Sequence, residues 1–443
     1  MFGRRRFLEG TLGLGVAGAI GSAATACGDS KSSGPAGSGT GPWLVGAYLS
    51  LSGAQSQFGI DTKEGIELAV EELNKAGGVK SREIKVLYED DKSKPDEANN
   101  KVLQLIDRDK VVALLGEIQS AISKAGAIVA NRKKIPMITP SSTNPDVTKT
   151  GPYAFRVCFI DDFQGQMGAE FAVKALGKKK IGLLYASDDL YSSGLASEFK
   201  KAIGPLGGEI VLEKSFLKTE SNFTTFLAEM KGKSPEVIYA PVYYNQMIPL
   251  ARQAKAEGMP GEMFVGGDGW SDTSLFKELE GAYFTDHYAP DVPWEKSRKF
   301  VEAYKARFNR MPTSLAAMGY DAALVLADAI KRAKTDTPDG IRDAIAETKD
   351  FPGATGSITI DGERNAVKPA VIVQIKEGTT TYKSVVGPGA DKLLEGGAAA
   401  PAPSAEPTAS AAASASAEPA ASASAVPAAS ASAAPAASAS AAP

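Results

Sequence analysis

Short apolar segments alternate with helix-like segments along the chain from Trp43 to about Val386. Runs such as VVALLGE and IPMIT are typical of strands buried in a parallel sheet, and apolar residues spaced three and four apart are typical of helices. Regular alternation of this kind predicts parallel sheets with helices on both faces. There are two such series, the second beginning at AFRVCFI, so we predict an α/β protein with two lobes, each a mostly parallel sheet.

The order of predicted elements changes after Gly281, where three helical segments and then three strands follow. We interpret these segments as returns of the chain to the two lobes, with crossings near 160–161, 283–288 and 361–368. Several crossings form a hinge, and a hinge between two lobes forms a cleft. The predicted lobes comprise 43–160 with 288–365, and 161–287 with 366–390.

The first helix is predicted over Asp61 to Ala76. Asp61 and Glu64 have the spacing of a capping box, in which side chains at a helix start accept hydrogen bonds from free backbone amides. Two glycines at 77–78 then favour the end of the helix.

Hydroxyl side chains follow two neighbouring predicted strands. Ser120 follows the first strand, and Ser141, Ser142 and Thr143 follow the second. In an open α/β sheet, the crevice beyond the carboxyl ends of the strands is where small ligands bind. Ser and Thr are also common as helix caps and turn formers, so this pattern alone leaves both a capping and a ligand-binding interpretation open.

The first 26 residues have the pattern of an export signal. Three arginines at 4–6 precede Phe7 and Leu8, and an uncharged stretch rich in Gly and Ala follows over 10–26. The pattern resembles a twin-arginine signal. A basic amphipathic helix or a membrane span is the alternative, but the stretch is short and weakly apolar for a span.

The signal ends in the string ATAC, whose last residue is Cys27. This string resembles a bacterial lipobox, in which the cysteine is acylated. A lone buried cysteine is the alternative, but 27–42 is predicted to be a flexible tether that cannot bury a thiol. We therefore predict an exported lipoprotein of a bacterium, periplasmic or at the cell surface, held at the membrane only through its lipid. Cys158 lies in an apolar run and is predicted to be an inert core residue.

The predicted C-terminal tail, 391–443, is almost wholly Ala, Ser and Pro from about Gly396. We predict that it is disordered, because it cannot bury enough apolar surface to offset its chain entropy. The formal charge of −3, with both signs mixed along the chain, argues against a nucleic-acid partner.

The chain lacks the residue patterns of a catalytic site. HExxH, paired CxxC, P-loop and dinucleotide-binding patterns do not occur, and there is no nucleophile elbow. The single histidine, His287, lies at a predicted crossing and is interpreted as a surface or hinge residue. We predict no enzymatic activity and no cofactor or metal.

Six strings, taken in order, resemble one protein family. They are LSLSGAQSQFG, GIELAVEELNKAGGVKSREIKVLYEDDKSKPDEA, PMITPSSTNP, SDDLYSSGLA, LARQAKAEGM and FVGGDGW. Together they resemble the leucine/isoleucine/valine-binding type of periplasmic solute-binding protein, over roughly Val45 to Lys376. The resemblance implies a type I two-lobed fold with three crossovers, and a monomer. It also implies capture of a branched-chain or other hydrophobic amino acid and its delivery to the permease of an ABC importer.

The resemblance assigns contacts with one end of the ligand to the first lobe. Ser120 matches the serine that binds the ligand α-carboxylate, Ser141 matches a residue that offers backbone groups, and Thr143 matches the threonine two positions on. Backbone amides at a helix start near Ser120 would favour a carboxylate independently of the family.

The second lobe is expected to supply aromatic and acidic contacts. By the resemblance, Tyr191 and Tyr243 match aromatics that close over the ligand, and Asp268 matches the acid that holds the α-ammonium. The other interpretations are a packing residue at a helix start for Tyr191, a strand-end aromatic for Tyr243 and a turn former for Asp268.

Three departures from the family pattern leave the identity of the ligand open. Phe58 stands where many members have Tyr, Asp268 is shorter than the more usual Glu, and Trp270 is expected to intrude on the side-chain pocket. The same scaffold could bind an amide, a urea-like or another small organic solute, or act as a sensory ligand-binding module.

Overall fold

The structure is a computed structural model that describes residues 41–388 and residue 390. The chain divides into two units, 1–399 and 400–443, and the description concerns the first. The predicted export signal, Cys27 and the tail 391–443 lie outside the described residues, as does all but the end of the predicted tether.

Five strands form the first sheet, in the order β2-β1-β3-β4-β5, and all neighbours in it are parallel. β5 pairs with β4, so AFRVCFI closes the first series; the prediction that it opens the second was wrong. Only its first three residues are a strand, and the rest carries the chain away from the sheet. The bounds are β1 Trp43–Leu49, β2 Ile84–Asp90, β3 Ala113–Gly116, β4 Met137–Thr139 and β5 Ala154–Arg156.

The second sheet has the order β15-β14-β10-β9-β8-β6-β7. Its strands from β7 to β10 are parallel, β14 pairs antiparallel with β10, and β15 pairs antiparallel with β14. The α/β class with two mainly parallel sheets is therefore confirmed. The bounds are β6 Lys180–Ala186, β7 Glu209–Phe216, β8 Val237–Tyr239, β9 Phe264–Gly266, β10 Tyr283–Asp286, β14 Ala370–Lys376 and β15 Thr379–Val386. A small antiparallel sheet contains β11 Phe351–Gly353, β12 Gly356–Ile360 and β13 Ala366–Val367.

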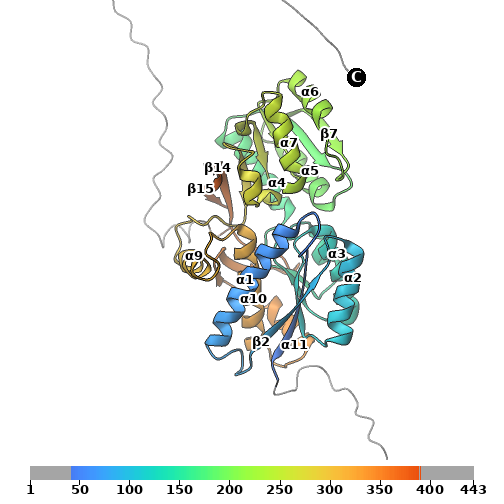
Figure 1. The fold of residues 1–443 in the computed structure, drawn as a ribbon, viewed down its shortest axis with the longest axis vertical. Helices are drawn as coiled ribbons and strands as arrows, with labels where there is room; N and C mark the ends of the chain where they lie inside the picture. Colours follow the sequence, from blue (N-terminus) through green and yellow to red (C-terminus); the bar gives the residue numbers. More distant parts are fainter. Residues whose placement is uncertain (1–40, 389, 391–443) are drawn as a thin grey trace, which may run out of the picture. The chain divides into compact units, whose positions relative to one another are not determined.

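Each large sheet has its own helices, and we call a sheet with its helices a lobe (Figure 1). The helices of the first lobe are α1 Ser56–Lys75, α2 Pro95–Leu103, α3 Ser120–Lys133, α9 Glu295–Phe308, α10 Ser314–Arg332 and α11 Pro338–Ala346. Those of the second lobe are α4 Asp161–Glu170, α5 Leu190–Ile203, α6 Thr224–Lys233, α7 Tyr244–Ala256 and α8 Thr273–Phe276. The chain passes between the lobes after β5, after β10 and before β14.

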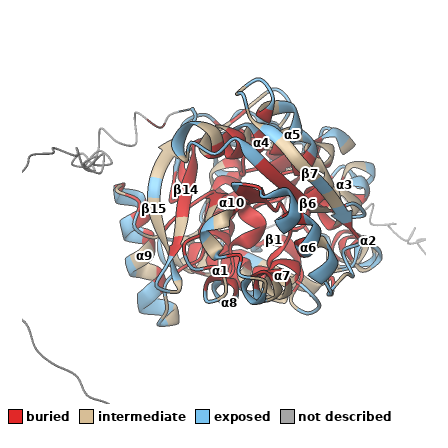
Figure 2. Ribbon diagram, turned by 90° about the horizontal axis from the view of Figure 1, so that it is seen from above, coloured by how far each residue is buried: buried red, intermediate tan, exposed pale blue. Residues whose placement is uncertain are grey.

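Residues on alternate sides of the first sheet belong to different cores. Val45, Ala47 and Leu49 of β1 pack in the cluster that contains residues of α1 and α10. Tyr48 and Leu114 pack in a second cluster with residues of α2 and α3. Successive strand residues point to opposite faces, so a run apolar at every position is what a sheet covered on both faces requires. Figure 2 shows the buried residues concentrated on the strands and on the inner faces of the helices.

Helix α1 begins at Ser56, five residues before the predicted start at Asp61. The capping-box interpretation of Asp61 was wrong, because its carboxylate is buried and bonds other parts of the chain. It accepts hydrogen bonds from Thr313 Oγ1 at 2.8 Å and from Arg310 Nη2 at 2.6 Å. A side chain used in tertiary contacts is not available to cap a helix, and sequence spacing does not distinguish the two roles.

Helices α1 and α10 pack at very short range. A Cβ atom on Gly65 would lie 1.9 Å from the carbonyl oxygen of Ala316, and one on Gly319 would lie 2.3 Å from that of Thr62. Only glycine allows the two backbones this close. The contact brings the start of α10 beside the start of α1, so residues far apart in sequence meet at the end of the first lobe.

No helix within 41–388 is both long enough and apolar enough to cross a membrane. Cys158 is buried, as predicted, and burial raises the pKa of its thiol to about 12. It is therefore an unreactive thiol at neutral pH.

Candidate functional site

A small cavity lies where the two lobes meet. The non-atom space within it is about 230 Å³, so it is small and tightly lined. The residues around it are Phe58, Ile118, Ser120, Ser141, Thr143, Tyr191, Tyr243, Asp268, Gly269 and Leu315. The predicted site residues are therefore brought together, with the exception of Trp270.

Three hydroxyl residues form the first-lobe wall of the cavity. Ser120 is the first residue of α3, and its Oγ accepts a hydrogen bond from Asn144 N at 3.3 Å. Ser141 and Thr143 lie in the loop after β4. Their hydroxyl oxygens are buried and have no hydrogen-bond partner among the described residues. A buried hydroxyl without a partner costs about 1–3 kcal/mol, so these two groups are available to a polar ligand.

A buried arginine, which was not among the predicted site residues, holds the loop after β4. Arg156 of β5 donates from Nη1 to Ser142 O at 2.5 Å and from Nη2 to Asn144 O at 2.8 Å. Burial lowers the pKa of this guanidinium. The signal was a single Arg inside the apolar run AFRVCFI, which is unusual for a buried strand. Arg156 supports the loop that carries Ser141 and Thr143.

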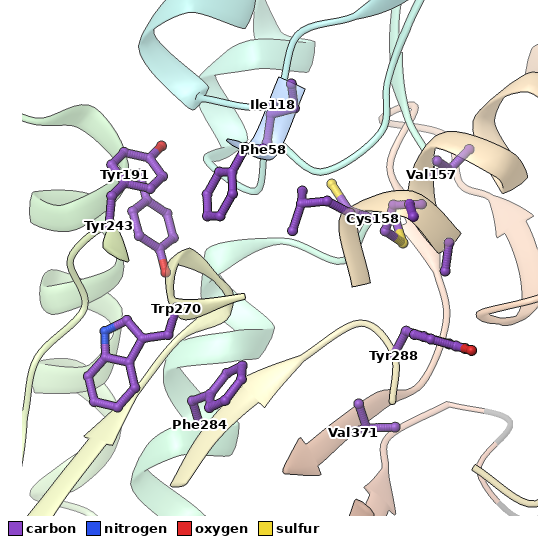
Figure 3. Packing of buried hydrophobic residues seen from close by; sticks show 14 of the residues in the cluster. Phe58, Ile118, Val157, Cys158, Tyr191, Tyr243, Trp270, Phe284, Tyr288 and Val371 are labelled. Atoms are coloured by element: carbon purple, nitrogen blue, oxygen red, sulfur yellow. The ribbon is translucent and has the colours of Figure 1, made fainter. Parts of the chain in front are cut away.

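Aromatic rings form another part of the wall (Figure 3). The rings of Tyr191 and Tyr243 are stacked with centroids 4.8 Å apart, and Phe58 lies 6.2 Å from Tyr243 in an edge contact. The hydroxyl of Tyr191 accepts a hydrogen bond from Gly269 N at 3.0 Å. Burial raises the pKa of both tyrosines well above the usual value, so both hydroxyls remain neutral. The aromatics come from both lobes, because Phe58 belongs to α1.

Asp268 places one carboxylate in the cavity. It is 8% exposed and begins the helical turn Asp268–Trp270, just after β9. Gln164 Nε2 lies 2.9 Å from its Oδ1, and His287 Nε2 lies 3.2 Å from its Oδ2. The carboxylate therefore has a neighbour on each oxygen and lies among the residues that line the cavity.

Trp270 does not line the cavity, contrary to the prediction. Its side chain is fully buried in the second lobe, with its ring 6.1 Å from that of Phe284 (Figure 3). A Cβ atom on Gly266 would lie 2.3 Å from the indole, so the ring packs directly on β9. The tight turn after Asp268 explains the difference, because it directs Asp268 and Trp270 to different sides.

His287 is buried, so the prediction of a surface residue was wrong, although it does lie beside a passage between the lobes. It is 2% exposed, and its ring lies 3.8 Å from that of Phe159. Burial lowers the pKa of the imidazole, which is therefore neutral at pH 7. The position of His287 after a strand gave no indication in the sequence that its ring would contact Asp268.

Sequence patterns also missed other residues in and near the cavity. Ile118 and Leu315 line it as apolar groups, one before α3 and the other at the start of α10. Asp161 begins α4 and is fully buried. Within the described part of the chain neither of its carboxyl oxygens makes a hydrogen bond of good geometry. Burial raises its pKa well above the usual value, and the nearby Thr143 side chain opposes that rise. Its signal was a pair of acids, Asp161-Asp162, directly after an apolar run.

The lobes contact each other around the cavity, which is therefore closed. Gln55 Nε2 donates to Asn245 Oδ1 at 3.1 Å, and Tyr244 OH donates to Ala54 O at 3.3 Å. On the other side, Asn144 Nδ2 donates to Leu190 O at 3.0 Å. A further, buried bond joins Ser314 Oγ of α10 to Asp286 Oδ1 of β10. Hydrogen bonds of this kind can break when lobes separate to admit a ligand.

The lining of the cavity combines three hydroxyl side chains, one of them at the first residue of α3, with one carboxylate and several apolar side chains. This arrangement can bind a zwitterion by both of its charges. The single histidine bonds Asp268, and among residues 41–388 and 390 no group of three or more His, Cys, Asp or Glu could hold a metal ion.

Comparisons with known proteins match this geometry. A family model described as "Periplasmic binding protein" matches residues 42–380. The solved structure of a leucine-binding protein, LivK, from Thermotoga maritima is 36% identical, with a TM-score of 0.74, over 78% of this chain and 99% of that chain. A branched-chain amino acid transporter substrate-binding protein, LivJ, from Streptococcus pneumoniae, solved with isoleucine, is 32% identical with the same TM-score, over 78% of this chain and 100% of that chain. The Leu/Ile/Val-binding protein homolog 3 of Brucella melitensis is 28% identical, over 71% of this chain and 86% of that protein.

Proposed function

Because the chain belongs to the periplasmic binding protein family, which binds solutes and is not enzymatic, we propose that it captures one hydrophobic amino acid between its lobes. A branched-chain amino acid is the preferred ligand, and an ABC importer receives it. The observation that carries the proposal is the pair of buried, unpartnered hydroxyls of Ser141 and Thr143, which line the same small cavity as the carboxylate of Asp268.

The polar groups suit the common end of an amino acid. The start of α3 at Ser120 offers backbone amides and a favourable dipole to a carboxylate. Asp268 offers the opposite charge to an ammonium, and a hydrogen bond to a charged group is worth about 1.5–3 kcal/mol. A ligand that has both a carboxylate and an ammonium would pair with the start of α3 and with Asp268 at the same time.

The apolar groups suit an aliphatic side chain. Phe58, Ile118 and Leu315 bring ring and branched carbon surface to the cavity, and no lysine or arginine lines it. A small apolar side chain gains about 25 cal/mol for each Å² that it buries, whereas a charged one would lose its hydration. The names of the similar leucine-binding and isoleucine-bound proteins support the same choice.

Capture requires the lobes to open and close. We propose that the ligand binds to the first lobe and that the second lobe then closes with Tyr191, Tyr243 and Asp268. A ligand shifts this equilibrium only by its difference in affinity for the two forms. The contacts of Asp268 arise in the closed form, so they would supply that difference.

The proposal is tested by thermal unfolding of the full-length chain with a matched set of ligands. Leucine, isoleucine and valine should stabilise the chain, by about 2.7 kcal/mol at a hundred times Kd. Isocaproate, which is leucine without its amine, and isopentylamine, which is leucine without its carboxylate, should stabilise it far less. Equal stabilisation by isocaproate would overturn the amino-acid assignment, and stabilisation only by amides or urea-like solutes would favour that other ligand class.

We also propose that the chain is exported and anchored by a lipid on Cys27, which lies outside the described residues. The support is the arginine-containing signal and the string ATAC before a tether. Cys27→Ser should move the protein from the detergent phase to the aqueous phase after expression in a bacterium. Unchanged partitioning would contradict the anchor, and Cys158→Ser, which removes a buried thiol, serves as the matched control.

A further inference from the structure

We propose that Gln164 and His287 are positioning residues that hold the Asp268 carboxylate in the cavity and thereby set the preference for ligands with an amine. Together with Thr285 they form what we call the Asp268 cluster. The inference rests on the proposed function, because it concerns the recognition of the ligand ammonium. It adds two residues from α4 and from the passage after β10, neither of which lines the cavity.

The amide of Gln164 has a defined orientation. Its Nε2 lies 2.9 Å from Asp268 Oδ1 and 2.8 Å from Thr285 Oγ1, and 3.5 Å from the backbone oxygen of Thr285. A flipped amide would place its oxygen against a carboxylate oxygen and a carbonyl oxygen, which only accept hydrogen bonds. Both N–H groups are therefore directed at the cluster, one of them at the carboxylate.

The tautomer of His287 follows from the same reasoning. Its Nε2 lies 3.2 Å from Asp268 Oδ2, and an ionised carboxylate only accepts, so the proton is on Nε2. Nδ1 has no hydrogen-bond partner among the described residues. Phe159 covers one face of the ring at 3.8 Å, which leaves the imidazole little freedom to turn. His287 is thus a neutral, fixed donor.

Because Gln164 and His287 are neutral, their effect on Asp268 differs from that of a charged donor. Lys or Arg beside Asp268 would cancel its charge and compete with the ligand ammonium. Gln164 and His287 donate hydrogen bonds to the carboxylate without placing a positive charge beside it. They also fix both oxygens before binding, so that little reorganisation is needed when the lobes close.

The experiment compares the affinity of leucine with that of isocaproate, measured by titration calorimetry on the full-length chain. Gln164→Met and His287→Leu should each weaken leucine binding by about 10-fold to 100-fold, since each removes a hydrogen bond to a charged group. Isocaproate has no ammonium, so its affinity should change by less than about threefold. The ratio of the two affinities should therefore fall. His287→Gln, which keeps an N–H donor, should restore part of the ratio.

Gln166→Met is the matched control, since Gln166 lies on the same helix and bonds only Glu170 on the surface. It should leave both affinities unchanged. A purely structural role for the cluster predicts equal losses for both ligands together with a lower melting temperature, and that result would overturn the inference.

The outcomes separate this inference from the proposed function. If the unaltered chain binds isocaproate as tightly as leucine, there is no ammonium site and both proposals fail. If the unaltered chain discriminates and the variants discriminate equally well, only the positioning role fails. Should Gln164→Met fold poorly, His287→Leu and His287→Gln still give the comparison.

Discussion

Replacing Asp268 with asparagine should weaken the binding of leucine by about 10-fold to 150-fold, which is the range for losing a hydrogen bond to a charged group. Asparagine keeps the shape of the side chain but removes its charge. It also introduces an amide N–H, which would face either Gln164 Nε2 or His287 Nε2, both of them donors. The substitution therefore removes the attraction for the ligand ammonium and disturbs the Asp268 cluster at the same time.

The measurement is titration calorimetry with leucine and with isocaproate. Isocaproate should bind Asp268→Asn at least as well as it binds the unaltered chain, because its one charge is negative like that of Asp268. Asp272→Asn is a suitable control, since Asp272 is also buried, lies four residues away and caps α8 without lining the cavity. Loss of isocaproate affinity in parallel with that of leucine would contradict the role assigned to Asp268.

Much of the architecture could be predicted because it depends on patterns that are local in sequence. The strands of both sheets were identified from short apolar runs, and the body of α1 from the spacing of its apolar residues. The sheet to which a short strand belongs is not local information. β5 joins the first sheet by pairing with β4, and nothing in AFRVCFI itself distinguishes that sheet from the next.

The strand-end rule indicated Ser120 and Ser141, whereas Tyr191, Tyr243 and Asp268 were assigned by the family resemblance, and all five agree with that rule. Ser120, Ser141, Tyr191, Tyr243 and Asp268 lie after strand ends, and the carboxyl ends of parallel strands meet at one edge of each sheet. Residues that reach the cavity by other routes were harder to find. Leu315 is there because α10 packs closely on α1, which no spacing within either helix reveals.

Side-chain direction within a turn was the least predictable feature. Asp268 and Trp270 are two residues apart, yet one lines the cavity and the other is part of the second-lobe core. His287 and Arg156 posed a different difficulty, because a polar residue in an apolar run is ambiguous until its partners are known. Each proved to be buried with specific partners, Asp268 for His287 and the loop after β4 for Arg156. Burial of a polar group requires such partners, but the sequence does not say which they are.

The second large effect is expected in the dependence of stability on pH, and it arises from a buried pair of acids. Ser50 Oγ lies 2.8 Å from Asp91 Oδ1 and 2.9 Å from Glu117 Oε1. One hydroxyl has one proton and cannot donate to both, so one of the two carboxyls must be protonated and donate to Ser50 Oγ while the hydroxyl donates to the other. Burial raises the pKa of Asp91 to about 6, and burial followed by the charge of Asp91 raises that of Glu117 well above its usual value.

The two raised pKa values determine how the stability of the folded chain changes with pH. In the unfolded chain both acids lose their protons near pH 4, whereas in the folded chain they keep them to higher pH. The folded state therefore binds more protons between about pH 4 and pH 6, and its stability falls as the pH rises through that window. A pKa shift of about two units for Asp91 corresponds to roughly 3 kcal/mol of lost stability by neutral pH.

Asp91→Asn should remove the part of the pH dependence of stability that arises from Asp91. Urea unfolding of the full-length chain at several values between roughly pH 4.5 and pH 8 should show a flatter profile for the variant, with the largest gain relative to the unaltered chain above about pH 6. Glu71→Gln provides a control of opposite sign, because a hydrogen bond from Arg307 lowers the pKa of Glu71. The Glu71 carboxylate stabilises the folded chain at pH values above its unfolded pKa, and this stabilisation is lost in acid. Glu71→Gln should therefore lower the stability only at the higher pH values. A profile for Asp91→Asn as steep as that of the unaltered chain would show that Asp91 is already ionised in the folded state at the lower pH values.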